Sequence, residues 1–103
     1  MLTDEFAAAV RKIDYSSASL KINLALAEPP RFSAAPADGV GPHLHGTMHI
    51  GPTIDYIERA FDDARAGRSS REPVLEITMP TSVDQTIAPP DRHILSMFVQ
   101  YAP

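Results

Sequence analysis

The segment Ser19-Leu20-Lys21-Ile22-Asn23-Leu24-Ala25-Leu26 decides the fold class of this chain. Leucine or isoleucine occupies every second position, and smaller or polar residues lie between. Because successive side chains of a strand point to opposite faces of a sheet, this period of two predicts a β-strand with one buried face over residues 20–26. Pro29-Pro30 follows. Proline cannot donate a hydrogen bond to a neighbouring strand, so the strand ends before it.

Three further segments are predicted to be strands. Apolar and polar residues alternate over residues 43–50, which Gly51-Pro52 ends, and over Val74–Met79, which Pro80 ends. The last segment, Ile94–Tyr101, carries apolar residues on both of its faces. A strand of that kind is covered on both sides, which predicts a central position in the sheet.

Two amphipathic helices are also predicted. The first runs from Thr3 to about Asp14, with acidic residues in its first turn and basic residues in its last, where each sign suits the helix dipole. The second begins after Thr53, which is a good N-cap residue. It ends before Gly67, the residue type most common just past a helix C-terminus.

The predicted order of elements is α-β-β-α-β-β. This order indicates an α+β fold with one mainly antiparallel sheet of about four strands and two helices, in a single domain over residues 1–103. The connections over residues 31–42 and 81–91 are rich in proline and turn-forming residues and are predicted to be loops. The predicted core joins the strands to the second helix and consists of Leu20, Ile22, Leu24, Leu26, Ile57, Phe61, Leu75, Ile77, Met79, Leu95, Met97 and Val99.

Composition excludes several classes of function. The chain has 103 residues, a formal net charge of −4 and no cysteine. Without cysteine there is no thiol catalysis, no iron–sulfur ligation and no disulfide framework. The negative charge and scattered basic residues offer no footprint for nucleic acid. No segment is long and apolar enough to predict a transmembrane helix, and we expect a cytoplasmic protein.

The histidines are the only cluster that suggests chemistry at a site. If residues 43–50 form one strand, alternation places His43, His45 and His49 on a single face. His49 would then lie about 13 Å along the strand from His45, too far for one metal ion to bridge. His43 and His45 remain a candidate pair of metal ligands. The alternative is that all three are polar side chains on the open face of a half-buried sheet.

Two charged motifs have simpler interpretations. Asp62-Asp63 lies in the predicted second helix, where neighbouring residues diverge by about 100°, so the pair is interpreted as a solvated helix face rather than an acid–base pair. Arg68 and Arg71 flank two serines, but no glycine-rich strand-to-helix turn accompanies them to hold a phosphate. Apart from the open candidate pair of His43 and His45, the residues themselves therefore predict no catalytic, cofactor-binding or metal-binding position.

Several segments, in order, resemble an internal stretch of the phytoene dehydrogenase-like flavoproteins. The resemblance runs from about Glu5 to Pro103 and is strongest to the branch of pyridine nucleotide-disulfide oxidoreductase domain-containing proteins. The segments that carry it are Ser19-Leu20-Lys21-Ile22-Asn23-Leu24-Ala25-Leu26, His49-Ile50-Gly51-Pro52, Asp55-Tyr56-Ile57-Glu58-Arg59-Ala60-Phe61-Asp62-Asp63-Ala64, Arg71-Glu72-Pro73-Val74-Leu75-Glu76-Ile77-Thr78-Met79-Pro80-Thr81-Ser82, Ala88-Pro89-Pro90 and Phe98-Val99-Gln100-Tyr101-Ala102-Pro103.

The resemblance implies that the chain is part of the substrate-binding domain of a longer enzyme. In that family this domain lies over FAD and shapes a cavity for an apolar, isoprenoid-like substrate, while a separate Rossmann unit holds the cofactor. The implied partners are the remainder of the parent flavoprotein and its apolar substrate, and a peripheral association of the parent with a membrane stays open. The resemblance transfers no FAD-binding or catalytic residue to this chain, and we expect it to be inactive alone.

The predicted central strand runs almost to Pro103, which we interpret as a sign that the chain is a fragment and that the isolated piece forms a homodimer. Two alternatives belong to other classes. One is a free-standing dimeric α+β module that binds a metal or small ligand through His43 and His45. The other is an interaction domain that pairs through a strand edge and binds no ligand.

Overall fold

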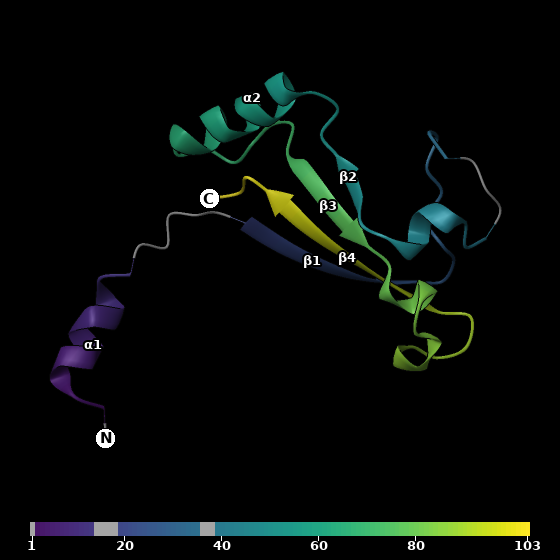
Figure 1. Cartoon of the computed structure of the whole chain (residues 1–103), viewed down its shortest axis with the longest axis horizontal. Coiled ribbons are helices and arrows are strands. Elements are labelled where there is room, and N and C mark those ends of the chain that lie inside the picture. Colours follow the sequence, from purple (N-terminus) through teal and green to yellow (C-terminus); the bar gives the residue numbers. More distant parts are fainter. Residues whose placement is uncertain (1, 14–18, 36–38) are drawn as a thin grey trace.

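The structure is a computed structural model that describes residues 2–13, 19–35 and 39–103 (Figure 1). Two α-helices and four strands form the main elements, and three short 3-10 helices connect them. In chain order they are α1 (Asp4–Arg11), β1 (Ser19–Leu26), η1 (Pro42–His45), β2 (Met48–Ile50), α2 (Ile54–Arg65), β3 (Val74–Thr78), η2 (Pro80–Ser82), η3 (Gln85–Ile87) and β4 (His93–Gln100).

The four strands form one antiparallel sheet in the order β1-β4-β3-β2. β4 lies between β1 and β3, which confirms the central position predicted from its two apolar faces. Leu95 lies opposite Leu24 of β1, and Met97 lies opposite both Ile22 of β1 and Ile77 of β3. The predicted α+β class with four antiparallel strands and two helices is confirmed.

Helix α2 has both of the predicted end signals. The Thr53 hydroxyl accepts a hydrogen bond from the N–H of Tyr56 at 3.1 Å, which satisfies one of the free donors of the first turn. At the other end Gly67 has a φ of +73°, a left-handed conformation that favours glycine. The N–H of Gly67 bonds to the carbonyl of Ala64, and that of Arg68 bonds to the carbonyl of Asp63, which together form a Schellman motif.

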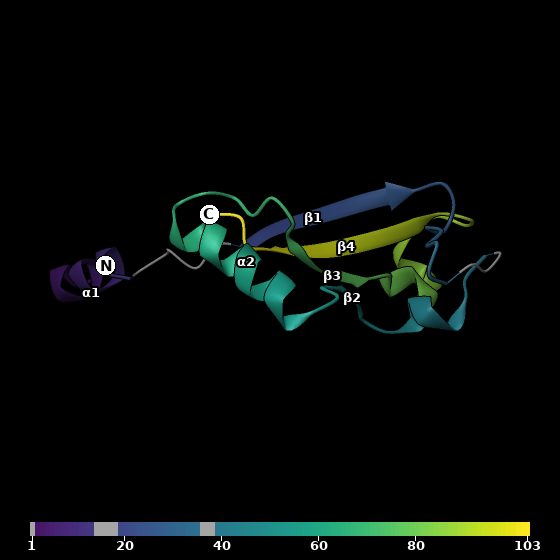
Figure 2. The same cartoon turned by 90° about the horizontal axis from the view of Figure 1, so that it is seen from above.

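α2 lies at the end of the sheet, where β4 ends and β3 begins, and does not cover a face (Figures 1 and 2). Ser70, in the turn after α2, holds this arrangement. Its hydroxyl donates to the Ala60 carbonyl at 2.7 Å, and its backbone N–H donates to the Tyr101 carbonyl at 2.9 Å. The Cα trace is 18 Å thick along its shortest axis, as expected for a sheet without a helical layer stacked on it.

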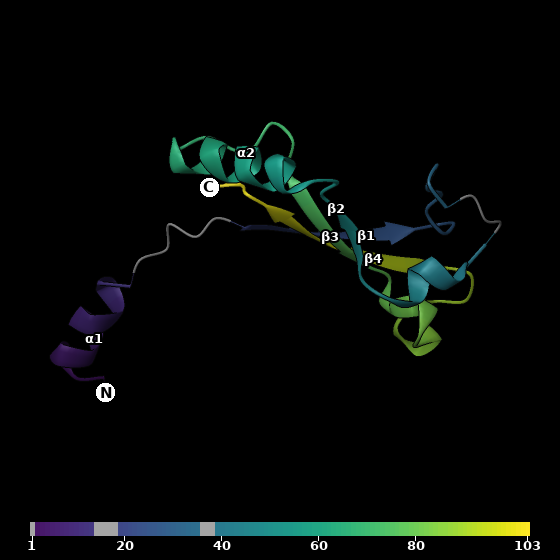
Figure 3. The ribbon, with the colours of Figure 1, turned by 45° about the horizontal axis from the view of Figure 1, so that its top comes forward.

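Helix α1 has an N-cap but does not pack against the sheet. The Thr3 hydroxyl accepts from the N–H of Phe6 at 3.2 Å, as the sequence predicts. None of its residues is buried, and it lies apart from the sheet (Figures 1 and 3). The predicted helix end at Asp14 falls outside the described residues.

The strand predicted over residues 43–50 is only partly correct. Strand β2 covers three residues, and the segment before it is the 3-10 helix η1. Pro42 begins this turn, where its fixed φ suits a helix and its missing N–H is not needed. The N–H of Leu44 then bonds to the carbonyl of Gly41 at 3.0 Å. The loop predicted before it contains a turn at Phe32–Ala35, and residues 36–38 lie outside the described part.

The short helices that follow β1 and β3 lie at the end of the sheet opposite α2 (Figure 3), and the core cluster lies at that end. η1 places Leu44 against the sheet with 1% of its surface exposed, and the Ser82 hydroxyl in η2 donates to the Leu44 carbonyl at 2.7 Å. The core cluster consists of buried Leu44, Ile77, Met79 and Leu95, with Leu26, Phe32, Met48, Leu75 and Met97 half-buried against it.

The predicted core is therefore wrong for two residues of β1 and two residues of α2. Leu20, Leu24, Ile57 and Phe61 are each exposed over more than a third of their surface. The prediction assumed that α2 packs across the sheet. Since α2 lies beside the strand ends instead, part of the apolar face of the sheet has no cover among the described residues.

Candidate functional site

One face of the sheet is almost entirely apolar, and we call it the apolar face. Directly opposed residues of antiparallel strands project to the same side, so the strand register fixes its members. Its apolar members are Leu20, Ile22, Leu24 and Leu26 of β1, Leu95, Met97 and Val99 of β4, Leu75 and Ile77 of β3, and Met48 and Ile50 of β2. His93 of β4, which lies opposite Leu26, is the one polar residue among the paired positions of this face.

The apolar face is covered at one end and open at the other. Leu44 and Phe32 pack against the end formed by Leu26, Met48 and Ile77. Toward α2, by contrast, Leu20 and Ile50 on the two outer strands remain exposed, whereas Val99 on the central strand β4 is buried. An apolar surface that spans the width of a sheet and is left in water is typical of a binding or packing surface.

The opposite face of the sheet is mixed and largely polar. Asn23 and Ser96 lie side by side on it, and the serine hydroxyl donates to the Asn23 side-chain oxygen at 3.0 Å. His49 and Glu76 form an exposed pair there, with 3.6 Å between Nε2 and the carboxylate. This contrast means that the two faces meet different environments, and the apolar face is the one suited to an apolar ligand or another layer of protein.

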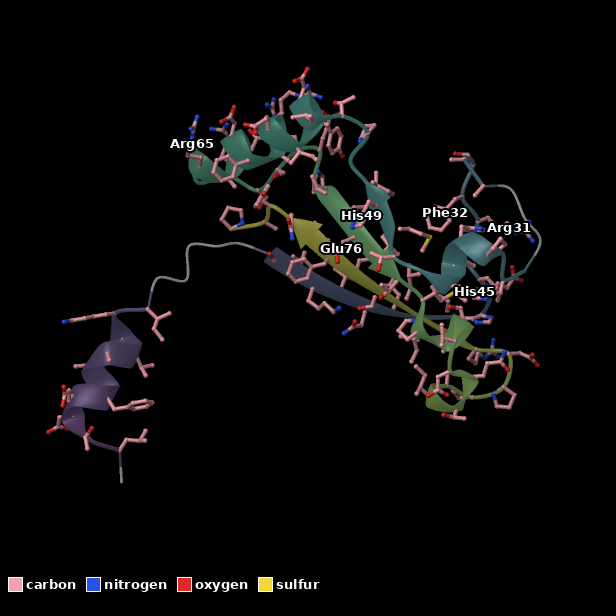
Figure 4. The ribbon with its side chains drawn as sticks, in the orientation of Figure 1. Arg31, Phe32, His45, His49, Arg65 and Glu76 are labelled. Atoms are coloured by element: carbon pink, nitrogen blue, oxygen red, sulfur yellow. The ribbon has the colours of Figure 1, made fainter. Side chains whose placement is uncertain are left out.

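The three histidines do not share a face, which corrects the prediction. His43 and His45 belong to η1, whereas His49 lies on β2 beside Glu76 (Figure 4). The His43 ring meets Phe32 edge to face at 6.0 Å, and its Nε2 is buried without a hydrogen-bond partner among the described residues. His45 is exposed and lines a hollow of about 210 Å³ between η1 and η2.

No metal site emerges from this arrangement. Over residues 2–13, 19–35 and 39–103, no group of three or more His, Asp or Glu side chains is placed to hold a metal ion. The candidate pair of His43 and His45 has no carboxylate partner in that part of the chain. The apolar face, rather than the histidines, is therefore the candidate functional site.

Asp63 corrects a second prediction, because it is not a solvated residue of the helix surface. Only 5% of it is exposed. Its carboxylate accepts hydrogen bonds from Arg68 Nη2 at 2.8 Å and from both the N–H and Nε of Arg71 at 3.2 Å. The bond from the Arg68 side chain, followed by the N–H of Arg71, lowers the pKa of Asp63 to about 2. Asp62 does match the prediction, since it is exposed and pairs with Arg65.

These bonds make Asp63 a structural anchor. They tie both arginines of the turn after α2 to the helix and offset part of their positive charge. A shallow hollow of about 310 Å³ beside them is also lined by Arg59 and Glu72, which approach each other to 3.8 Å. Because acidic and basic groups alternate in it, the hollow has no charge suited to an anion.

The fold and the apolar face together define an antiparallel α+β unit whose sheet is covered on one side only in part. Two curated proteins are similar to the chain over 99% of its length, and both are named pyridine nucleotide-disulfide oxidoreductase domain-containing protein 2. The mouse protein is 37% identical over 106 residues and the rat protein is 36% identical over 106 residues. The chain spans only 18% of the length of each relative.

Other comparisons add no further relative. No family model matches the chain, and no solved structure matches it. In the part of the chain that the structure describes, no helix has both the length and the apolar character needed to cross a membrane.

Proposed function

We propose that this chain is part of the substrate-binding domain of an FAD-dependent oxidoreductase of the phytoene dehydrogenase-like kind. The similarity to two relatives whose name includes an oxidoreductase domain supports the reaction class. The open apolar face is the observation that carries the proposed role. A surface of leucine, isoleucine and methionine side chains binds hydrocarbon by excluding water, and the one polar residue of this face, His93, lies at its covered end.

In this proposal the apolar face forms one wall of a cavity for an apolar, isoprenoid-like substrate. Its open end accepts the hydrocarbon, and the Leu44 cluster closes the other end and holds the strands in register. Burial of each methylene group of such a substrate contributes about 0.8 kcal/mol. The wall also keeps water away from the reacting carbon, which is the usual contribution of protein groups in an enzyme whose cofactor carries the chemistry.

The residues of this chain do not fit FAD, so we assign the cofactor to other parts of the parent protein. The connection between β2 and α2 is Gly51-Pro52-Thr53, which lacks the Gly-x-Gly-x-x-Gly pattern of a dinucleotide site. Pro52 also removes one of the backbone N–H groups that would face a pyrophosphate. We derive no catalytic step from this chain.

A replacement experiment in the mouse relative tests the proposal. The matching stretch of that protein is replaced by this chain, and the bound flavin per purified protein is measured by absorbance for the parent and the chimera. We expect the chimera to fold and to retain the flavin of the parent. If the parent carries no flavin, or if the chimera folds without it, the assignment to an FAD enzyme is wrong.

A pair of variants in the same chimera tests the role of the apolar face. Leu24→Glu places a charge on that face, and Lys21→Glu places the same charge on the opposite face of the same strand. With geranylgeraniol as the probe and flavin fluorescence as the signal, we expect Leu24→Glu to weaken binding by about tenfold or more, while Lys21→Glu changes it little. Equal effects of the two variants, or no binding by the unmodified chimera, would contradict the proposed role.

A further inference from the structure

β1 presents a free edge that is unusually well suited to strand pairing. It has eight residues, no proline and only one charged residue, Lys21. Among the described residues it pairs with β4 on one side and with no strand on the other. Proteins usually protect such edges with proline, charges, bulges or a covering element, because unpaired backbone groups bind any strand that approaches.

The exposure of side chains on the apolar face shows that β1 lacks a second neighbouring strand. Leu24 is 37% exposed, and its direct partner on β4, Leu95, is 5% exposed. Leu20 is 48% exposed, and its partner Val99 is 8% exposed. These residues share one face and one layer of the sheet. β4 has a strand on each side and β1 has a strand on one side only, so a second neighbour would shield the β1 side chains in the same way.

We propose that the free edge of β1 pairs in antiparallel fashion with β1 of a second copy of this chain. A two-fold axis perpendicular to the sheet and passing through Ile22 or Asn23 keeps both apolar faces on the same side, since directly opposed residues then have the same parity. When the axis passes through Asn23, Ile22 of one copy lies opposite Leu24 of the other, and Lys21 lies opposite Ala25. When the axis passes through Ile22, Lys21 lies opposite Asn23.

The strand is thus complementary to itself in either register. Each leucine or isoleucine of one copy that has a partner within the strand meets a leucine or isoleucine of the other, and the only charge never meets its own copy. The edge of β2 does not offer this, because it has three residues and carries the His49–Glu76 pair beside it. Pairing through β1 leaves the apolar face open, so this proposal is independent of the proposed function.

Single-cysteine variants test the pairing directly, because the natural chain contains no cysteine. Asn23→Cys and Ile22→Cys each lie on the axis of one register, where directly opposed Cβ atoms are about 5 Å apart and a disulfide can form. His49→Cys, on the exposed far edge, is the matched control. We expect one of the two β1 variants to form disulfide-linked dimers on the order of 100-fold faster than the control at micromolar protein.

Light scattering on the chain without cysteine provides the second measurement. We expect a mass twice the 11.2 kDa of one chain. Asn23→Lys places like charges opposite each other in both registers and should weaken the dimer by about fivefold, whereas His49→Lys on the other edge should not. Circular dichroism shows whether each variant is folded.

Three results would overturn the proposal. One is a single-chain mass for the unmodified protein at high concentration. Another is disulfide formation in both β1 variants no faster than in His49→Cys. The third is a dimer dissociation constant, measured over a dilution series, that Asn23→Lys leaves unchanged in a folded variant, which would place the contact on another surface such as the apolar face.

Discussion

Leu44→Ala is the substitution that most directly tests how this sheet is stabilised. Leu44 is 1% exposed and is held in η1, a short 3-10 helix, rather than in a strand. It packs on Ile77, Met79 and Leu95, and few other large side chains are fully buried. Removal of its terminal carbons leaves a cavity that the surrounding short elements must either collapse into or tolerate.

The expected cost is about 2–5 kcal/mol of unfolding free energy, as for other leucine-to-alanine changes in a core. For a chain of this size each kcal/mol lowers Tm by roughly 4–8 °C, so Leu44→Ala should melt at least about 8 °C below the parent chain. Thermal unfolding followed by circular dichroism measures the shift. Val83→Ala is the matched control, because Val83 is 77% exposed and its truncation should change stability by less than about 0.5 kcal/mol.

If Leu44→Ala does not fold, Leu44→Met keeps the test open, since it preserves volume and should cost less than about 1.5 kcal/mol. A Leu44→Ala protein that melts within a degree of the parent chain would refute the account of the core. It would mean that η1 does not close the covered end of the apolar face.

Three further predictions concern single groups. The pKa of Asp63 is lowered from 3.8 to about 2, so its ion pairs contribute in full above about pH 4 and are lost as the pH falls through 2. The difference in unfolding free energy between the parent chain and Asp63→Asn, measured by urea unfolding, should therefore shrink on acidification. A difference that stays constant with pH would contradict this. Gly67→Ala should cost about 1 kcal/mol because of its φ of +73°, whereas Gly46→Ala, at a φ of −127° with the same open space around it, should be neutral by the same assay. Ser82→Ala removes the hydrogen bond to the Leu44 carbonyl and should lower the free energy of unfolding by about 0.5–1.5 kcal/mol, and an unchanged urea midpoint would show that the bond contributes nothing.

Sequence reasoning succeeds here where local signals are redundant. Thr53 marks the N-terminus of α2 and Gly67 marks its C-terminus, and both take part in capping in the structure. β1 has four apolar residues at a strict period of two, which no helix can bury on one face. In contrast, residues 43–45 offer only Leu44 between two histidines. One apolar residue fits a strand and a 3-10 turn equally well, and Pro42 decides for the turn.

The position of α2 could not be derived from its own sequence. Its amphipathic pattern predicts that one face is covered, but the pattern does not say whether the cover is the sheet face or the residues beyond the strand ends. The structure shows that Ser70 binds Tyr101 and Ala60, and that Asp63 binds Arg68 and Arg71. These contacts depend on the turn that follows the helix, where side-chain direction has no periodic signal. The open apolar face is a consequence of that turn.

The two proposals use different atoms of the same strand. Pairing at the edge of β1 engages backbone N–H and C=O groups that lie in the plane of the sheet, whereas a substrate would meet side chains perpendicular to it. A two-fold axis normal to the sheet joins two four-stranded sheets with both apolar faces on one side. Such a pair doubles the apolar surface and leaves it accessible, whereas a face-to-face dimer would bury it. Asn23→Lys should therefore raise the dissociation constant of the dimer and leave probe binding intact, because its side chain belongs to the polar face beside Ser96.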